Sequence, residues 1–125
     1  PREGLILYSE SVVGGFTTKI FNTKTLSTRN LGLSILPEKC VWLKNEDLIC
    51  AGNTSVEEAI YPDSWYAGII GFEDQIFRIY TQSNTFDVLD QGERGFDITN
   101  LQVDEINGLL YFINKKDGLL WRFSF

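Results

Sequence analysis

The sequence contains no histidine, comparatively few basic residues and no long apolar run. Without histidine, Ser-His-Asp and Cys-His catalysis are excluded, as is any zinc site that needs imidazole. Eleven basic residues stand against seventeen acidic ones, a net charge of −6, so the basic surface of a nucleic-acid-binding protein is missing. Apolar runs such as Leu5-Ile6-Leu7-Tyr8 are far shorter than the roughly 20 residues of a membrane span. We therefore expect a soluble segment that does not itself insert into a membrane.

Targeting and enzyme motifs are also missing from the sequence. It has no signal-peptide pattern, GxSxG elbow, phosphate-binding glycine loop or Walker motif. Glu57 and Asp97 could act as acid and base in glycoside hydrolysis, but many other acidic pairs would fit equally well. We predict no catalytic residue, no metal and no cofactor. Because the chain opens with Pro1 instead of Met, we expect a trimmed chain, a processed product or a piece of a longer protein.

The residues that are present favour short β-strands in one folded domain. Hydrophobic residues make up 43% and aromatic residues 14% of the 125 positions. Almost every apolar stretch is short, rich in β-branched and aromatic residues, and bounded by Gly, Asn, Asp or Pro. No helical period is sustained, since the nearest stretch, 56–60, is one turn long and is stopped by Pro62. We predict an all-β, antiparallel chain with strands at 4–10, 17–23, 39–44, 47–52, 67–72, 75–81, 85–90, 101–106, 109–114 and 119–125.

Dipeptides between these segments predict hairpins. Asn107-Gly108 and Asp117-Gly118 each stand between two predicted strands, and both are residue pairs that adopt the positive φ angles of tight hairpin turns. Asn45-Glu46 takes the same position between 39–44 and 47–52, with less favourable residues.

Two strand types recur along the chain. The first is anchored at Ile6, Ile49 and Leu110, and the second places a basic residue before an apolar one, at Lys19-Ile20, Arg78-Ile79 and Arg122-Phe123. The separation from the first type to the second is 14, 30 and 13 residues, and from the second back to the first 29 and 31. Without an insertion of about 16 residues in the middle copy, the period is about 43 to 45, which is typical of a four-stranded β-propeller blade.

We therefore predict a partial β-propeller of about two and a half antiparallel, four-stranded blades, with strand A innermost. Strands B-C-D lie at about 4–31, A-B-C-D at about 39–90 and A-B-C at about 100–125. A sandwich or barrel of ten strands is the alternative. A partial ring leaves blade surfaces uncovered, so we expect the remaining blades of the same protein or further copies of the chain as partners.

Residues 96–123 resemble the closing blades of bacterial WD40-like or TolB-like β-propeller proteins, and residues 39–52 and 61–79 resemble the preceding blade. This resemblance implies an extracytoplasmic propeller with a membrane anchor in the full-length protein. It also implies an interaction platform. The alternative function is the non-catalytic portion of a propeller hydrolase or lyase whose active site lies mostly on other blades.

Cys40 and Cys50 are placed symmetrically about Asn45 on the two arms of a predicted hairpin. A loop of odd length centred on Asn45 would bring the two cysteines directly opposite each other, close enough for a disulfide. A two-residue turn would pair Cys40 with Ala51 instead, and two buried thiols are the alternative. A disulfide would favour an extracytoplasmic location.

The best candidate for a binding surface is the insertion at 53–68 together with the connections at 32–38 and 90–99. In a propeller these loops share one face, and the insertion and the second connection hold five of the six net negative charges. Large aromatic residues in the insertion are of the kind favoured at binding hot spots. We predict an acidic, aromatic surface for a basic protein or peptide, formed by Glu57, Glu58, Tyr61, Asp63, Trp65, Tyr66, Asp90, Glu93 and Asp97. The alternative is a lid that folds back over the blade.

Overall fold

The structure is a computed structural model that describes residues 4–13, 15–31, 33–52, 74–92 and 94–125. Within these ranges the chain forms β-strands and one short 3-10 turn, η1 (Pro37–Lys39), and no α-helix. The prediction of an all-β chain is confirmed. The strands are β1 (Leu5–Val12), β2 (Gly15–Asn22), β3 (Ser27–Asn30), β4 (Cys40–Trp42), β5 (Leu48–Gly52), β6 (Gln75–Tyr80), β7 (Thr85–Asp90), β8 (Ile98–Asp104), β9 (Leu109–Asn114) and β10 (Leu120–Ser124).

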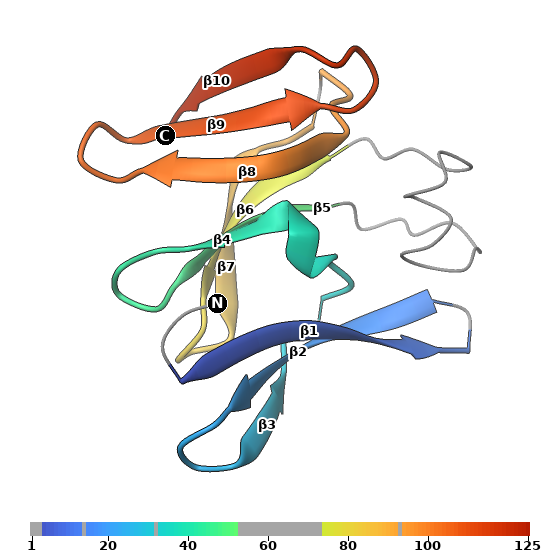
Figure 1. The fold of residues 1–125 in the computed structure, drawn as a ribbon, viewed down its shortest axis with the longest axis vertical. Helices are drawn as coiled ribbons and strands as arrows, with labels where there is room; N and C mark the ends of the chain where they lie inside the picture. Colours follow the sequence, from blue (N-terminus) through green and yellow to red (C-terminus); the bar gives the residue numbers. More distant parts are fainter. Residues whose placement is uncertain (1–3, 14, 32, 53–73, 93) are drawn as a thin grey trace.

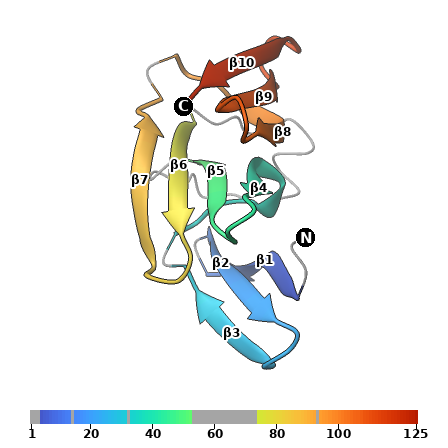
Figure 2. The same ribbon diagram turned by 90° about the vertical axis from the view of Figure 1, so that its left-hand side faces the viewer.

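The strands form three antiparallel sheets that follow one another in sequence. Sheet 1 contains β1-β2-β3, sheet 2 contains β4-β5-β6-β7 and sheet 3 contains β8-β9-β10, and every pair of neighbouring strands is also consecutive in the chain. The three sheets succeed one another along the long axis, with sheet 3 at the top and sheet 1 at the bottom of Figure 1. Figure 2 shows the strands of sheet 2 side by side, from β7 at one edge to β4 at the other. The predicted antiparallel pairing is confirmed, and none of the three sheets closes on itself.

Nine of the ten predicted segments coincide with a strand, with ends displaced by at most three residues. The tenth, 67–72, lies outside the described residues. Strand β3 was not predicted as a separate segment, because its four residues are polar and all are exposed. It is held by backbone pairing with β2, from Lys19 opposite Asn30 to Asn22 opposite Ser27. Apolar patterning cannot detect such a strand.

Strand β5, inside sheet 2, is buried on both faces. All five residues of β5 are buried, and successive side chains point to opposite sides of the sheet. Leu48 and Cys50 belong to an apolar cluster with residues of sheet 1, which we call the first interface. Ile49 and Ala51 belong to a second cluster with residues of sheet 3, the second interface. The continuous apolar run of β5 therefore reflects two interfaces with different partners.

The two interfaces define which positions of the three sheets are equivalent. Three residue pairs lie on corresponding sides of their sheets: Ile6 opposite Phe21 faces away from sheet 2, Leu48 opposite Ile79 faces sheet 1, and Leu110 opposite Phe123 faces sheet 2. The predicted anchors Ile6 and Leu110 are therefore equivalent. Ile49 and Ile20 are each displaced by one residue, because both point toward the following sheet. A shift of one residue along a strand reverses the face on which a side chain lies, so sequence spacing alone did not fix these two positions.

The same pair of hydrogen bonds connects each sheet to the segment that leads into the next. The Thr18 N–H donates to the carbonyl of Leu33 at 3.2 Å, and its hydroxyl oxygen accepts from the Ile35 N–H at 2.7 Å. Asp74 repeats this arrangement, since its N–H donates to the carbonyl of Phe96 at 2.6 Å and its Oδ2 accepts from the N–H two residues further on at 2.7 Å. The internal repeat is thus visible in backbone contacts as well as in strand order.

The predicted hairpin glycines adopt positive φ, 64° at Gly108 and 70° at Gly118, but Asn107 and Asp117 before them do not. The expectation of positive φ at both residues of each dipeptide is therefore wrong. Longer loops close these hairpins, and side chains stabilise them, since the Asn107 N–H donates to Asp104 and the Leu119 N–H donates to Asp117. A single residue of positive φ suffices for such loops.

Truncating a side chain in the second interface should destabilise the whole chain. Ile49 has no exposed surface, and we expect Ile49→Ala to lower the free energy of unfolding by about 2 to 5 kcal/mol through lost burial and the resulting cavity. Ile106→Ala is the matched control, because Ile106 is 88% exposed, and it should change the free energy by less than about 0.5 kcal/mol. Urea unfolding measures both, and equal effects would contradict the packing described above.

Candidate functional site

The hairpin that carries the two cysteines has a loop of odd length. The Leu43 N–H donates to the Asp47 carbonyl at 2.8 Å, which leaves three loop residues centred on Asn45, and Glu46 adopts a φ of 71°. Cys40 lies directly opposite Cys50 in this register, with 4.1 Å between their Cα atoms, and the two are joined by a disulfide. Of the two loop geometries considered for this sequence, the structure has the one that opposes the cysteines.

Removal of this disulfide should reduce stability. The chain between the cysteines is short, so replacing both by alanine should lower the free energy of unfolding by about 2 to 3 kcal/mol through a less restricted unfolded state. Thermal unfolding of the double variant against the unmodified chain measures this effect. If thiol labelling of the unmodified, denatured chain without reductant finds two free thiols, the bond does not form in solution.

Three charged side chains that are distant in sequence meet in the interior beside the second interface. Lys39 ends η1, Asp74 directly precedes β6, and Asp97 directly precedes β8. The Lys39 Nζ donates to Asp74 Oδ2 at 2.5 Å and to Asp97 Oδ1 at 2.7 Å. The relative exposure of these side chains is 1%, 0% and 3%. We call this group the lysine network.

The lysine network is almost completely satisfied by hydrogen bonds. The Lys39 Nζ also donates to the Ile98 carbonyl at 2.9 Å, so it has as many acceptors as N–H donors. The Asp97 N–H donates to the side chain of Asn114 at 3.0 Å, which fixes the backbone at that point. Asp74 Oδ1 is the exception, because this buried oxygen has no hydrogen-bond partner among the residues that the structure describes. Two carboxylates and one ammonium leave an excess negative charge in the interior when all three groups are ionised.

This imbalance acts on the acid–base equilibrium of Asp74. Burial raises the pKa of the Asp74 carboxyl from 3.8 to about 6, against the opposing effect of the Lys39 ammonium. The network connects the segment before sheet 2 with the segment before sheet 3, and its groups are out of contact with solvent. We therefore interpret it as a structural link between sheets. The net contribution of such a buried ion network to the free energy of unfolding is small. Removing one of its partners is nevertheless strongly destabilising, because a buried charge is left uncompensated.

The raised pKa of Asp74 predicts a loss of stability with increasing pH. Between about pH 4 and 6 the Asp74 carboxyl of the folded chain retains a proton that the unfolded chain releases, so the contribution of Asp74 to the free energy of unfolding should fall over this range by about 3 kcal/mol and then level off. Asp74→Asn cannot titrate, and its stability relative to the unmodified chain should therefore improve as the pH rises. Urea unfolding from pH 4 to 7 tests this, and parallel curves for the two proteins would contradict it.

Asp104→Asn provides a control, because its effect on stability should change with pH in the opposite direction to that of Asp74→Asn. Hydrogen bonds from the Asn107 side chain and backbone lower the pKa of the exposed Asp104 carboxyl. This carboxylate therefore stabilises the fold above its unfolded pKa, and the contribution is lost as the pH falls through its folded pKa. The relative stability of Asp104→Asn should consequently decrease as the pH rises, in contrast to that of Asp74→Asn.

Most of the predicted binding surface lies outside the described residues, namely Glu57, Glu58, Tyr61, Asp63, Trp65, Tyr66 and Glu93. Of the two described members, Asp97 is 2% exposed and belongs to the lysine network. Its assignment to an exposed acidic surface is therefore wrong, because a buried carboxylate that neutralises an ammonium is not accessible to a partner. Asp90 lines a cavity of about 210 Å³ that Arg94 and Arg122 also line, so its surroundings are not uniformly acidic.

The ends of the connections do meet, as expected for loops that share one face. Asp74 ends the connection from β5 to β6, and its N–H bonds to Phe96 in the connection from β7 to β8. Gly92, in the same connection, has a φ of 83° and lies so close that a Cβ atom there would be 2.8 Å from the Asp74 carbonyl oxygen. Lys39 brings the connection from β3 to β4 to the same place.

Two of the three recurring basic residues pair with acidic neighbours. Lys19 bonds to Glu10 at 2.9 Å and Arg78 to Asp47 at 3.3 Å. Arg122, the third, is exposed beside the cavity with Asp90. These residues do not form a basic stripe.

Sequence reasoning missed Lys39 and Asp74, because no motif spacing marks a structural ion network. One signal becomes visible only with the strand bounds of the structure, because the predicted strand 39–44 includes Lys39 and the predicted strand 101–106 begins four residues after Asp97. Lys39, Asp74 and Asp97 each directly precede a strand, and strands β4, β6 and β8 begin at the same end of the sheets. Three charged residues at strand starts on one end of a repeat are candidates for a common cluster.

Comparisons with protein-family models, with curated proteins and with solved structures give no match to this chain, so the resemblance to WD40-like and TolB-like proteins stays a prediction. In the described part of the chain, no helix has the length and hydropathy needed to cross a bilayer.

Proposed function

We propose that the three sheets are blades of a β-propeller that serves as a non-catalytic binding module. The observation that carries this proposal is the burial of β5 on both faces, because sheet 2 packs between two sheets in which consecutive strands are also neighbours. A blade inside a ring has this environment, because each blade packs against two neighbours. A two-sheet sandwich instead leaves the outer face of each sheet to solvent.

The connections support the same proposal. The fourth strand of sheet 2, β7, leads to β8 at the opposite edge of sheet 3, and β3 leads in the same way to β4. The first strands of sheets 2 and 3 lie near each other, and η1 contacts both β1 and β8. This arrangement is compatible with a propeller, in which the innermost strand of each blade lies next to the central axis of the ring. The paired hydrogen bonds of Thr18 and Asp74 repeat at both transitions between sheets.

The binding surface that we propose is the loop face that carries the insertion at 53–68 and Asp90. Its partner is a basic protein or peptide, since Glu57, Glu58, Asp63 and Glu93 give this face a net acidic character even without Asp97. The meeting of Asp74, Gly92 and Lys39 supports a common location for the three connections. The charged groups of the lysine network are buried and paired with one another, so they are not accessible to a substrate. This favours a scaffold over an enzyme. The disulfide supports an extracytoplasmic location.

Binding of an arginine-rich peptide tests this function. We expect the labelled peptide to bind the chain, as measured by fluorescence anisotropy, with an affinity that falls steeply between low and high salt. A glutamate-rich peptide of equal length should not bind. Trp65→Ala and the pair Glu57→Gln with Glu58→Gln should each weaken binding at least about tenfold, the loss of one strong contact.

Glu105→Gln is the matched control for charge, because Glu105 is exposed in the turn between β8 and β9 and does not belong to the proposed face. Its affinity for the peptide should be unchanged. If Glu105→Gln weakens binding as much as the changes at Glu57 and Glu58, the attraction is due to net charge alone and the proposed face is wrong.

A further inference from the structure

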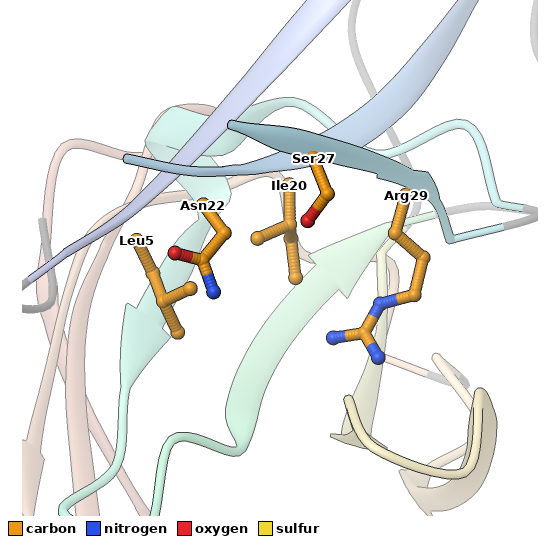
Figure 3. Close-up of a pocket in the computed structure, with 5 residues that line it drawn as sticks. All are labelled: Leu5, Ile20, Asn22, Ser27 and Arg29. Carbon is orange, nitrogen blue, oxygen red and sulfur yellow. The ribbon is translucent and has the colours of Figure 1, made fainter. Parts of the chain in front are cut away.

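A small cavity of about 170 Å³ lies on the face of sheet 1 that is turned toward sheet 2 (Figure 3). Its five lining residues are Leu5, Ile20, Asn22, Ser27 and Arg29. They come from three neighbouring strands, with Asn22 opposite both Leu5 and Ser27 and with Ile20 opposite Arg29. Paired residues and alternate residues along a strand share one face, so the backbone register gathers the five side chains.

The polar side chains of this cavity present hydrogen-bond donors. The Asn22 Oδ1 accepts from the N–H groups of Lys24 at 2.9 Å and Thr25 at 3.2 Å, so the amide oxygen is occupied. The amide nitrogen remains, and in Figure 3 it points into the space below the sheet. The Ser27 hydroxyl lies 2.7 Å from the Thr25 hydroxyl and points into the same space. If the Thr25 hydroxyl donates to it, its own proton is free to donate to a ligand.

Arg29 completes the donor set with a positive charge. Its guanidinium group carries only donors, and Figure 3 shows it reaching into the same space as the Asn22 amide. Arg29 makes no ion pair in the described part of the chain, and no carboxylate is among the five lining residues. The rest of the lining is apolar, with Ile20 only 2% exposed. The cavity therefore combines donors and a single positive charge with an aliphatic wall.

We propose that this cavity binds a short aliphatic carboxylate. A guanidinium group and a carboxylate form paired, charge-assisted hydrogen bonds, and the amide and hydroxyl donors are placed to bind the same oxygens. The aliphatic wall of Leu5 and Ile20 favours a ligand with a short apolar chain over a bare inorganic anion. The volume, about six times that of a water molecule in the liquid, limits the ligand to a few carbon atoms.

Titration of the chain with butyrate, followed by NMR chemical shifts, tests this site. We expect saturable shifts confined to the lining residues, and no saturable shifts with butylamine, which has the opposite charge. Arg29→Gln keeps the side-chain length and removes the charge, and it should weaken butyrate binding at least about tenfold. Because Arg29 is exposed on β3, the variant should retain its fold, which its melting temperature checks.

Two comparisons can overturn the proposal. Arg94→Gln removes the same charge elsewhere, so it should bind butyrate like the unmodified chain; an equal loss would show a general effect of net charge. Inorganic phosphate should bind more weakly than butyrate, and tighter phosphate binding would show that the aliphatic wall has no role. Unchanged butyrate affinity in Arg29→Gln would exclude the site. None of these outcomes depends on binding of a basic peptide to the loop face.

Discussion

The burial of sheet 2 between two other sheets is the constraint on which the rest of the structure depends. An exposed antiparallel sheet alternates apolar and polar residues, but β5 is buried at every position because each of its faces has a partner. Every substitution in this strand therefore affects one of two interfaces. The same double burial distinguishes this arrangement of three successive sheets from a two-sheet sandwich, and it makes the outer sheets dependent on the central one.

Polar groups maintain the order of the sheets at the points where the chain passes from one to the next. Thr18 and Asp74 make the same pair of hydrogen bonds to the entering segment, one through the backbone N–H and one through the side chain. At the second transition a neutral hydroxyl is replaced by a carboxylate, and Lys39 compensates its charge together with that of Asp97. Hydrogen bonds within an ion network require specific positions of the two sheets, which apolar packing does not. Burying the charged groups, however, requires their desolvation, which is unfavourable. Because burial raises the pKa of Asp74, the stability of the link between sheets 2 and 3 should depend on pH.

These links also bring residues of three connections together. Lys39, Asp74 and Asp97 meet at one end of the sheets, where their side chains are buried and not accessible to a partner. The cavity beside sheet 1 is lined by residues of that sheet alone, whereas Asp90 of the proposed binding face lines the cavity of about 210 Å³ together with residues of sheet 3.

The sequence by itself determined the all-β class and the positions of nine strands, and it left two loop geometries open for Cys40 and Cys50, of which the structure has the one that opposes them. These features follow from local physics, since strand propensity, turn residues and the period of two act over a few neighbouring positions. The tertiary structure alone decided the pairing of β3, the one-residue offset of Ile20 and Ile49, and the burial of Asp97 beside Lys39 and Asp74. Each depends on contacts between residues far apart in sequence, and a charge placed before a strand has the same local pattern whether it meets solvent or a buried partner.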